Sequence, residues 1–355
     1  MPRSSATYEV EVMAASLPRG AGDRHRHPSP GPAWVHPWRF LPQPSIMGTD
    51  GGGRMGSTDA SRRALPVARP DGAVIAAEVI GDARHPLVLL VAGAESSMDW
   101  WRPEFCDLLV QGGRCVVRFD QRGTGETTLG PPPRTDGLHV ALGDAIAVLD
   151  AAGAVADAAD GVGDGSPPHA AHWVGFSAGG WVAQLAALDH PDRVLALTLI
   201  ETSPTMFEAD PDLPGATDRM QQAWADSVPE PDWGDPESVI EYHVVVDRDY
   251  AGDDFDEAHD RAIWADTVRR SPGMHRDEGE AEIVDHGVRW RERLGGLRVP
   301  TTVVHGTADP VFPLGNGQAL ARDIPGARLV TIRGGGHDLP PSTWDAVVGV
   351  IAGTA

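Results

Sequence analysis

Lysine is absent from this chain of 355 residues, so all 29 of its basic residues are arginine. Aspartate and glutamate together number 51, which gives a formal net charge of −22. A surface this acidic repels nucleic acids and anionic membranes. The composition therefore argues against both of these as partners, and we expect a protein that binds a small-molecule substrate.

Cysteines and long apolar runs are also scarce. The two cysteines, Cys106 and Cys115, are too few for a disulfide framework, and we expect reduced, buried thiols. No run of about 18 apolar residues predicts a membrane-spanning helix. The N-terminus lacks a basic segment followed by an apolar one, so no secretory signal is expected. We predict a cytoplasmic protein, monomeric or homodimeric.

Sequence motifs for cofactors are missing too. The chain has no P-loop, no Cys/His cluster with metal-ligand spacing and no dinucleotide-binding G-x-G-x-x-G after its first strand. Asp253, Asp254 and Asp256 form an acidic cluster, but they lack the spacing of an EF-hand and indicate a solvated surface. We therefore expect neither a metal nor an organic cofactor.

The first 63 residues differ in composition from the rest of the chain. Segments such as Arg24–Pro28 and Gly51–Gly53 are rich in Pro, Gly, Arg and His and show no sustained hydrophobic period. Such a segment buries too little apolar surface to offset the entropy lost on ordering. We predict that residues 1–63 are mostly a disordered tail, in which Met47 and Met55 could be alternative translation starts.

From residue 64 onward, apolar strands alternate with helices. The hydrophobic pattern predicts strands over 73–80, 86–91, 115–119, 172–176, 194–200, 301–305 and 327–332. It predicts helices over 101–111, 140–152, 179–188, 317–324 and 342–351. This alternation is typical of an α/β fold, in which a mostly parallel, twisted sheet is covered by helices on both faces.

One region interrupts the alternation. Residues 204–295 contain no strong strand pattern, many acidic residues and two segments of helical character, 261–270 and 283–294. We predict a helical cap over 204–295, inserted into a core made of 64–203 and 296–355.

A nucleophile elbow is the strongest chemical signal. The segment Gly175-Phe176-Ser177-Ala178-Gly179 follows an apolar strand and precedes a helix, as the pattern G-x-S-x-G requires. The turn is so sharp that side chains at 175 and 179 would collide with neighbouring elements, which glycine avoids. We predict that Ser177 is a catalytic nucleophile.

A serine nucleophile needs a base, and the base needs an orienting carboxylate. His337 follows the last predicted strand and three glycines, and Asp309 follows the strand over 301–305. The chain order Ser, acid, His matches that expected with this elbow. Glu201, at the end of the preceding strand, is the rival for the acid, whereas Asp338 is expected to point away from the histidine.

The developing oxyanion needs two backbone donors. We expect one from the amide of Ala178, directly after the nucleophile, and one from the amide of Ala94, in the loop after the strand over 86–91. Trp100, Trp101 and Trp181 lie near these loops in the sequence, where they could line an apolar substrate pocket or simply pack in the core.

Together these motifs resemble the α/β-hydrolase superfamily over residues 65–353. The resemblance is carried by residues 119–125 (a D-x-R-G-x-G-like loop), 175–179, 305–313 and 334–337. Residues 91–101, 117–128, 188–198 and 334–341 look most like the aclacinomycin methylesterase group of polyketide-tailoring esterases. One departure is Ala92, where this loop more usually has histidine.

The resemblance implies an α/β-hydrolase fold and a carboxylic-ester hydrolase for a medium-sized, fairly apolar substrate. Because the cap is the least similar part and selects the substrate, substrate identity does not carry over. A serine nucleophile argues against the dehalogenase and epoxide-hydrolase branches, which use aspartate. Carbon–carbon bond hydrolysis, perhydrolysis, a lyase reaction and ligand binding without turnover remain as alternatives.

Overall fold

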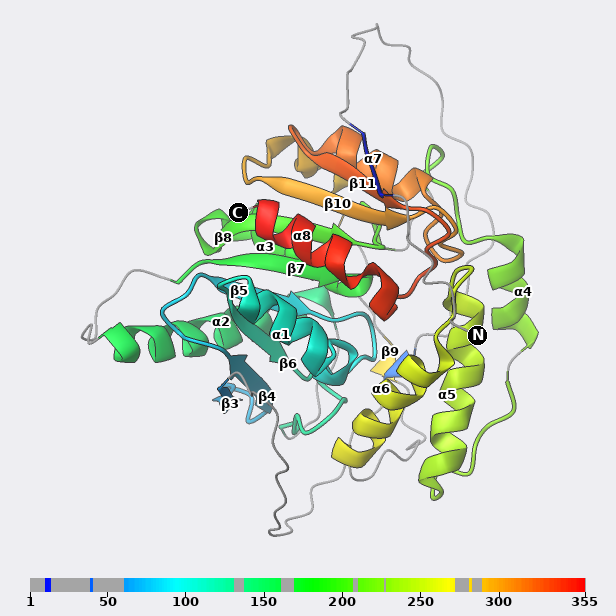
Figure 1. The fold of residues 1–355 in the computed structure, drawn as a ribbon, viewed down its shortest axis with the longest axis horizontal. Coiled ribbons are helices and arrows are strands. Elements are labelled where there is room, and N and C mark those ends of the chain that lie inside the picture. The colour runs from blue at the N-terminus through cyan, green and yellow to red at the C-terminus, as the bar shows by residue number, and fades with distance from the viewer. Residues whose placement is uncertain are drawn as a thin grey trace, which may run out of the picture.

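The computed structural model describes residues 10–13, 39–40, 61–130, 137–160, 169–206, 210–226, 228–271, 281–282 and 289–354. Nine of the described strands form one twisted sheet in the order β1-β11-β10-β8-β7-β5-β6-β4-β3 (Figure 1). Their bounds are Val10–Met13 (β1), Arg62–Ala68 (β3), Val74–Ile80 (β4), Leu87–Val91 (β5), Cys115–Phe119 (β6), Ala171–Phe176 (β7), Val194–Ile200 (β8), Thr301–Gly306 (β10) and Arg328–Ile332 (β11). A separate pair joins β2 (Arg39–Phe40) to β9 (Ala281–Glu282).

The six central strands of the sheet, from β11 to β6, run parallel, whereas both edges are antiparallel. Every residue of β5, β6, β7 and β10 is buried, because helices cover both faces of the sheet. This arrangement confirms the predicted, mostly parallel α/β sheet.

Two layers of helices enclose the sheet. On one face, α1 (Pro103–Gln111) and α8 (Trp344–Thr354) share a core cluster with the sheet. On the other face, a second cluster includes residues of α2 (Leu138–Asp160), α3 (Ala178–Asp189) and α7 (Gly315–Asp323). Both cysteines are buried free thiols, Cys106 in α1 and Cys115 in β6.

Helix α2 is the one described helix long and apolar enough to span a membrane, with a mean hydropathy of 1.6 over its most apolar window. It places Leu142, Ala145 and Leu149 in the core beneath the sheet. A core helix passes the same test of length and composition, so this finding is weak grounds for a membrane span.

Three further helices lie between β8 and β10 in the chain: α4 (Asp218–Asp226), α5 (Pro236–Tyr250) and α6 (Glu257–Arg270). Figure 1 shows them grouped to one side of the sheet, toward which the central strands point. They occupy the region predicted as a cap. Of the helix predicted over 283–294, residues 283–288 lie outside the described part, and Arg291–Gly296 forms a 3-10 helix.

Most of the predicted tail, 1–63, also lies outside the described residues. Within it, Val10–Met13 pairs antiparallel with β11, and Arg62 already belongs to β3. The sequence pattern missed β3, because this edge strand is largely exposed and contains two arginines and a proline.

Candidate active site

Ser177 lies in the sharp turn between β7 and α3. Its backbone has φ 53° and ψ −122°, a conformation that residues with a side chain rarely adopt. A Cβ atom at Gly175 would lie 2.3 Å from the Gly179 carbonyl oxygen, and one at Gly179 would lie 2.3 Å from the Val91 carbonyl oxygen. The glycines of the motif are therefore required by close backbone contacts, and the turn places the serine at the N-terminus of α3.

A continuous hydrogen-bonded chain joins the three predicted catalytic residues. His337 Nε2 lies 3.0 Å from Ser177 Oγ, and His337 Nδ1 lies 3.0 Å from Asp309 Oδ2. All three side chains are buried. The histidine backbone is fixed from the cap side, since its amide donates to the Tyr250 carbonyl oxygen over 2.8 Å. The fold thus brings Asp309 together with Ser177, 132 positions earlier, and with His337, 28 positions later.

Asp309 is held by its own loop. Its Oδ1 accepts hydrogen bonds from the amides of Val311 and Phe312, at 2.8 and 2.9 Å. Burial alone would raise the pKa of Asp309, but the charge of His337 and its hydrogen bond outweigh burial and hold this pKa below its ordinary value. The carboxylate is therefore ionised and can orient the imidazole.

The two other acids considered from the sequence do not take this place. The Glu201 carboxylate accepts from the Gly306 amide over 2.8 and 2.9 Å. Asp338 accepts from the backbone of Gly252 and Gly336. In the structure, therefore, Asp309 is the acid that is hydrogen-bonded to His337 Nδ1.

Ala94 and Ala178, the predicted oxyanion donors, line one common pocket. The loop that carries Ala94 is braced by Gln121, whose Nε2 donates to the carbonyl oxygens of Ala92 and Gly93 over 2.8 and 2.7 Å. The same loop passes close to the nucleophile, because a Cβ atom at Gly93 would lie 3.4 Å from Ser177 Cβ. A donor role for Ala94 and Ala178 remains a prediction.

The three predicted pocket tryptophans separate in the structure. Trp181 lines the pocket next to Ala178, and Trp100 stacks on Phe176, the residue before the nucleophile, with ring centroids 3.9 Å apart. Trp101 is instead only 1% exposed, against Phe105 in the core beneath α1. Trp101 is therefore a core residue, because its ring packs against Phe105 of α1.

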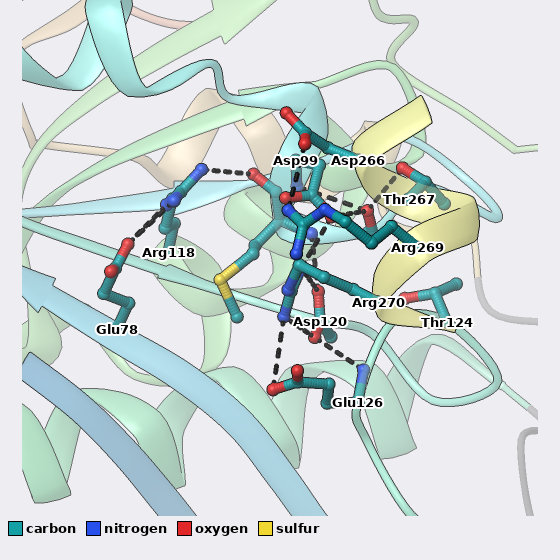
Figure 2. Close-up of polar contacts among 12 residues, drawn as sticks. Glu78, Asp99, Arg118, Asp120, Thr124, Glu126, Asp266, Thr267, Arg269 and Arg270 are labelled. Carbon is teal, nitrogen blue, oxygen red and sulfur yellow. Dashed lines mark hydrogen bonds and ion pairs between the residues drawn. The ribbon is translucent and has the colours of Figure 1, made fainter. Parts of the chain in front are cut away.

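A buried ion-pair cluster, which the sequence did not reveal, ties helix α6 to the loop after β5 (Figure 2). Arg270 donates to Asp99 Oδ2 and Asp120 Oδ2, each over 2.6 Å. Asp120 Oδ1 also accepts from the Met98 amide over 2.8 Å. Asp120 lies in the motif over 119–125, but nothing in the sequence pairs it with Arg270, which is 150 residues later. The cluster fixes helix α6 relative to the loop that carries Ala94.

Glu95 is a second feature missed from the sequence. Its backbone has φ 56°, and its buried Oε1 has no hydrogen-bond partner. Burial raises the pKa of this carboxyl to about 7. Backbone strain and a buried carboxyl oxygen without a partner set Glu95 apart from the rest of this loop.

Comparisons with known proteins agree with this fold. The family model of the alpha/beta hydrolase fold matches residues 85–341. A rhodomycin D methylesterase from Streptomyces peucetius is 28% identical over 79% of this chain and 94% of its own length. A second one, from Streptomyces sp. (strain C5), is 29% identical over 79% of this chain and 94% of its own length.

Solved structures show the same fold at lower identity. An esterase from Rhodococcus sp. ECU1013 has a TM-score of 0.58 and 20% identity, covering 82% of this chain and 99% of that one. A meta-cleavage product hydrolase from Pseudomonas fluorescens IP01 has a TM-score of 0.56 and 18% identity, covering 82% and 96%. With the elbow, the hydrogen-bonded triad and a family match over most of its length, this chain belongs to the α/β-hydrolase family.

Proposed function

We propose that this protein is a serine hydrolase that cleaves a carboxylic ester through an acyl-enzyme. The observation that carries the proposal is the chain of hydrogen bonds from Ser177 through His337 to Asp309. An ionised Asp309 fixes the imidazole so that Nε2 faces the serine hydroxyl, and it stabilises the imidazolium that forms when the proton is transferred.

The first half of the reaction acylates the serine. His337 Nε2 takes the proton of Ser177 as Oγ bonds to the ester carbonyl carbon. The negative charge on the carbonyl oxygen is stabilised by the amides of Ala178 and Ala94. The bond to the alcohol oxygen then breaks, and the leaving alcohol takes the proton from Nε2.

The second half releases the acid. Water gives a proton to His337 Nε2 and adds to the acyl carbon. The tetrahedral intermediate collapses, the bond to Ser177 Oγ breaks, and the serine regains its proton. Atoms and charge balance with water as the sole co-reactant.

As the substrate class we propose methyl esters of polycyclic aromatic carboxylic acids. Two relatives that match over 94% of their own lengths are named as methylesterases of rhodomycin D. The pocket beside Ala178 is lined by apolar side chains that suit an apolar acyl group, including Leu138, Trp181 and Met206, together with the charged side chains of Asp120, Arg122 and Asp144. The net charge of −22 supports a small-molecule partner over nucleic acid or an anionic membrane.

The test is release of methanol from a series of methyl esters that runs from acetate to tricyclic aromatic carboxylates. We expect activity that increases with the size of the aromatic acid. Ser177→Ala and Asp309→Asn should each lower kcat/KM by about 10⁴-fold. Ser342→Ala, an exposed serine outside the site, is the matched control and should leave the rate unchanged.

The proposal fails if wild type and Ser177→Ala release methanol equally slowly from every ester. Rapid cleavage of carbon–carbon bonds in diketones, with methyl esters left intact, would support carbon–carbon hydrolysis instead.

A further inference from the structure

Behind the Asp309 carboxylate lies a second carboxyl group for which the proposed reaction has no use. Glu201 directly follows β8, and His305 lies near the end of β10. Glu201, His305 and Asp309 are 1%, 0% and 2% exposed, and one ligand atom from each lies within 4.8 Å of the other two. Three titratable groups thus share one closed space beneath the triad.

The backbone holds Glu201 in this space at a cost. Glu201 has φ 45°, in the left-handed region that strains a residue with a side chain. Its neighbours on both sides support the nucleophile turn: the Ile200 carbonyl oxygen accepts from the Ser177 amide over 2.9 Å, and Thr202 Oγ1 donates to the Ser177 carbonyl oxygen over 2.7 Å. The strained conformation directs the Glu201 carboxyl toward Asp309.

The position of one proton decides what this cluster does. Asp309 is ionised, so an ionised Glu201 would place a second negative charge in the same buried space. Protonating Glu201 would avoid this charge, and protonating His305 would balance it. His305 Nε2 donates to the Phe312 carbonyl oxygen over 2.6 Å, and His305 Nδ1 is buried without a hydrogen-bond partner. A protonated His305 would therefore bury a charged N–H group with no acceptor, which is costlier than an unpaired neutral nitrogen.

The Asp309 carboxylate, 3.6 Å from His305 Nε2, favours a charged His305, but burial outweighs it. From the loop after β11, Asp338 and His337 face the cluster, and a charged Asp338 disfavours a second anion at Glu201. Burial, followed by the charge of Asp309, raises the pKa of Glu201 well above its ordinary range, and burial lowers the pKa of His305. A neutral His305 leaves the proton on Glu201.

We propose that Glu201 is a positioning residue whose protonated carboxyl donates a hydrogen bond to Asp309. Asp309 then accepts from four donors: the amides of Val311 and Phe312, His337 Nδ1 and Glu201. These four donors hold the Asp309 carboxylate at a fixed angle to the imidazole. With Glu201 neutral, Asp309 is the single negative charge that faces the His337 imidazolium. The inference deepens the proposed function, since it concerns the same triad.

Glu201→Gln is the informative variant, because glutamine keeps the size and offers an amide N–H donor in place of the carboxyl O–H, but can never be ionised. The readout is the midpoint of the His337 ring titration, followed by NMR on ¹⁵N-histidine-labelled full-length protein. If Glu201 is protonated in the wild type, Glu201→Gln should shift this midpoint by less than about half a pH unit. If Glu201 is ionised, the variant removes a neighbouring anion and should lower the midpoint by about 1 unit or more, which would overturn the proposal.

Infrared spectroscopy of the wild type supplies a second measurement that needs no variant to fold. With ¹³C in the glutamate side chains, we expect the carbonyl stretch of a protonated glutamic acid to persist at pH 8. The same band should remain in Asp338→Asn, the control from the same cluster, and disappear in Glu201→Gln. A wild-type spectrum in which all glutamates are ionised at pH 8 contradicts the proposal.

Neither measurement depends on turnover. A protein that hydrolyses no ester but shows the persistent band and the small midpoint shift would refute the proposed function and leave the role of Glu201 in the fold intact. A protein that hydrolyses esters but shows an ionised Glu201 would do the reverse.

Discussion

At the scale of single residues, the nucleophile turn depends on glycines, which have no Cβ atom, at positions 175 and 179. Ser177 has a positive φ because it joins the end of β7 directly to the start of α3. The glycines on either side of it lie in contact with other backbone atoms. The space that a methyl group would need at Gly179 is already filled by the Val91 and Ala92 carbonyl oxygens, at 2.3 and 2.5 Å from the Cβ position. Those carbonyls end the strand that leads into the Ala94 loop.

Gly179→Ala should therefore damage both stability and chemistry. The added methyl group must push α3 away from β5, so we expect a loss of about 2 kcal/mol or more in the free energy of unfolding and at least a tenfold slower reaction at Ser177. Gly349→Ala is the matched control, because it lies in α8 with no atom within 4 Å of the Cβ position. It should stabilise the helix by up to about 1 kcal/mol. Urea unfolding of both variants checks this, and equal stabilities would refute the steric account.

The triad could be predicted from the sequence because each member follows a recognisable strand. The sequence favoured Asp309 as the acid but left Glu201 open as its rival, since both follow neighbouring parallel strands and reach the same edge of the sheet. What separates them is local: the amides of Val311 and Phe312 turn back onto Asp309, whereas Glu201 is bound by the Gly306 amide. Such turn geometry has no signature in residue types alone.

At the scale of elements, the joint between α6 and the core is built from charge. Arg270, in the last turn of α6, is 14% exposed and bridges Asp99 and Asp120, which are nearly or fully buried (Figure 2). Beside it, Thr267 Oγ1 and Ser97 Oγ lie 2.9 Å apart. The loop between β5 and α1 is therefore held by Arg270 and Thr267 of α6 and by Asp120, which follows β6.

Arg270→Gln should weaken this joint. Removing the guanidinium leaves two buried carboxylates without their cation, which costs about 3 kcal/mol of unfolding free energy. Because the same loop carries Ala94, we also expect reaction at Ser177 to slow by at least fivefold. Arg269→Gln is the matched control: Arg269 is 68% exposed and pairs with Asp266 at the surface, so its loss should cost less than about 0.5 kcal/mol. If the two variants unfold at the same urea concentration, the buried ion pairs of Arg270 do not contribute the proposed stability.

The elements themselves were predicted unevenly, for a physical reason. Strands β5 to β8 and β10 are buried on both faces, so their sequences are apolar runs that cannot be mistaken for loops. Helices α4 and α5 were not identified individually, because α4 buries only Met220 and α5 only three residues, which leaves a faint apolar period. A cap covers a site rather than a core, and its helices accordingly show weaker patterns.

At the scale of the whole molecule, the sheet, its two helical layers and the cap converge on one edge. The parallel strands β7, β8 and β10 deliver Ser177, Glu201 and Asp309 to their carboxyl ends, where ligand sites form in α/β folds. The cap contributes from the other side, through the Tyr250 carbonyl and Arg270. The core therefore supplies the triad, and the predicted cap over 204–295 is the part that we expect to select the substrate.

The central claim, an activated serine in this setting, is tested most directly by covalent labelling. Full-length wild type, Ser177→Ala and His337→Ala are treated with a fluorophosphonate probe, and the products are measured by intact mass and peptide mapping. We expect one adduct on the wild type, located at Ser177, none on Ser177→Ala and at least about 10³-fold slower labelling of His337→Ala. A wild type that stays unlabelled, or that is labelled equally fast without His337, would contradict this claim.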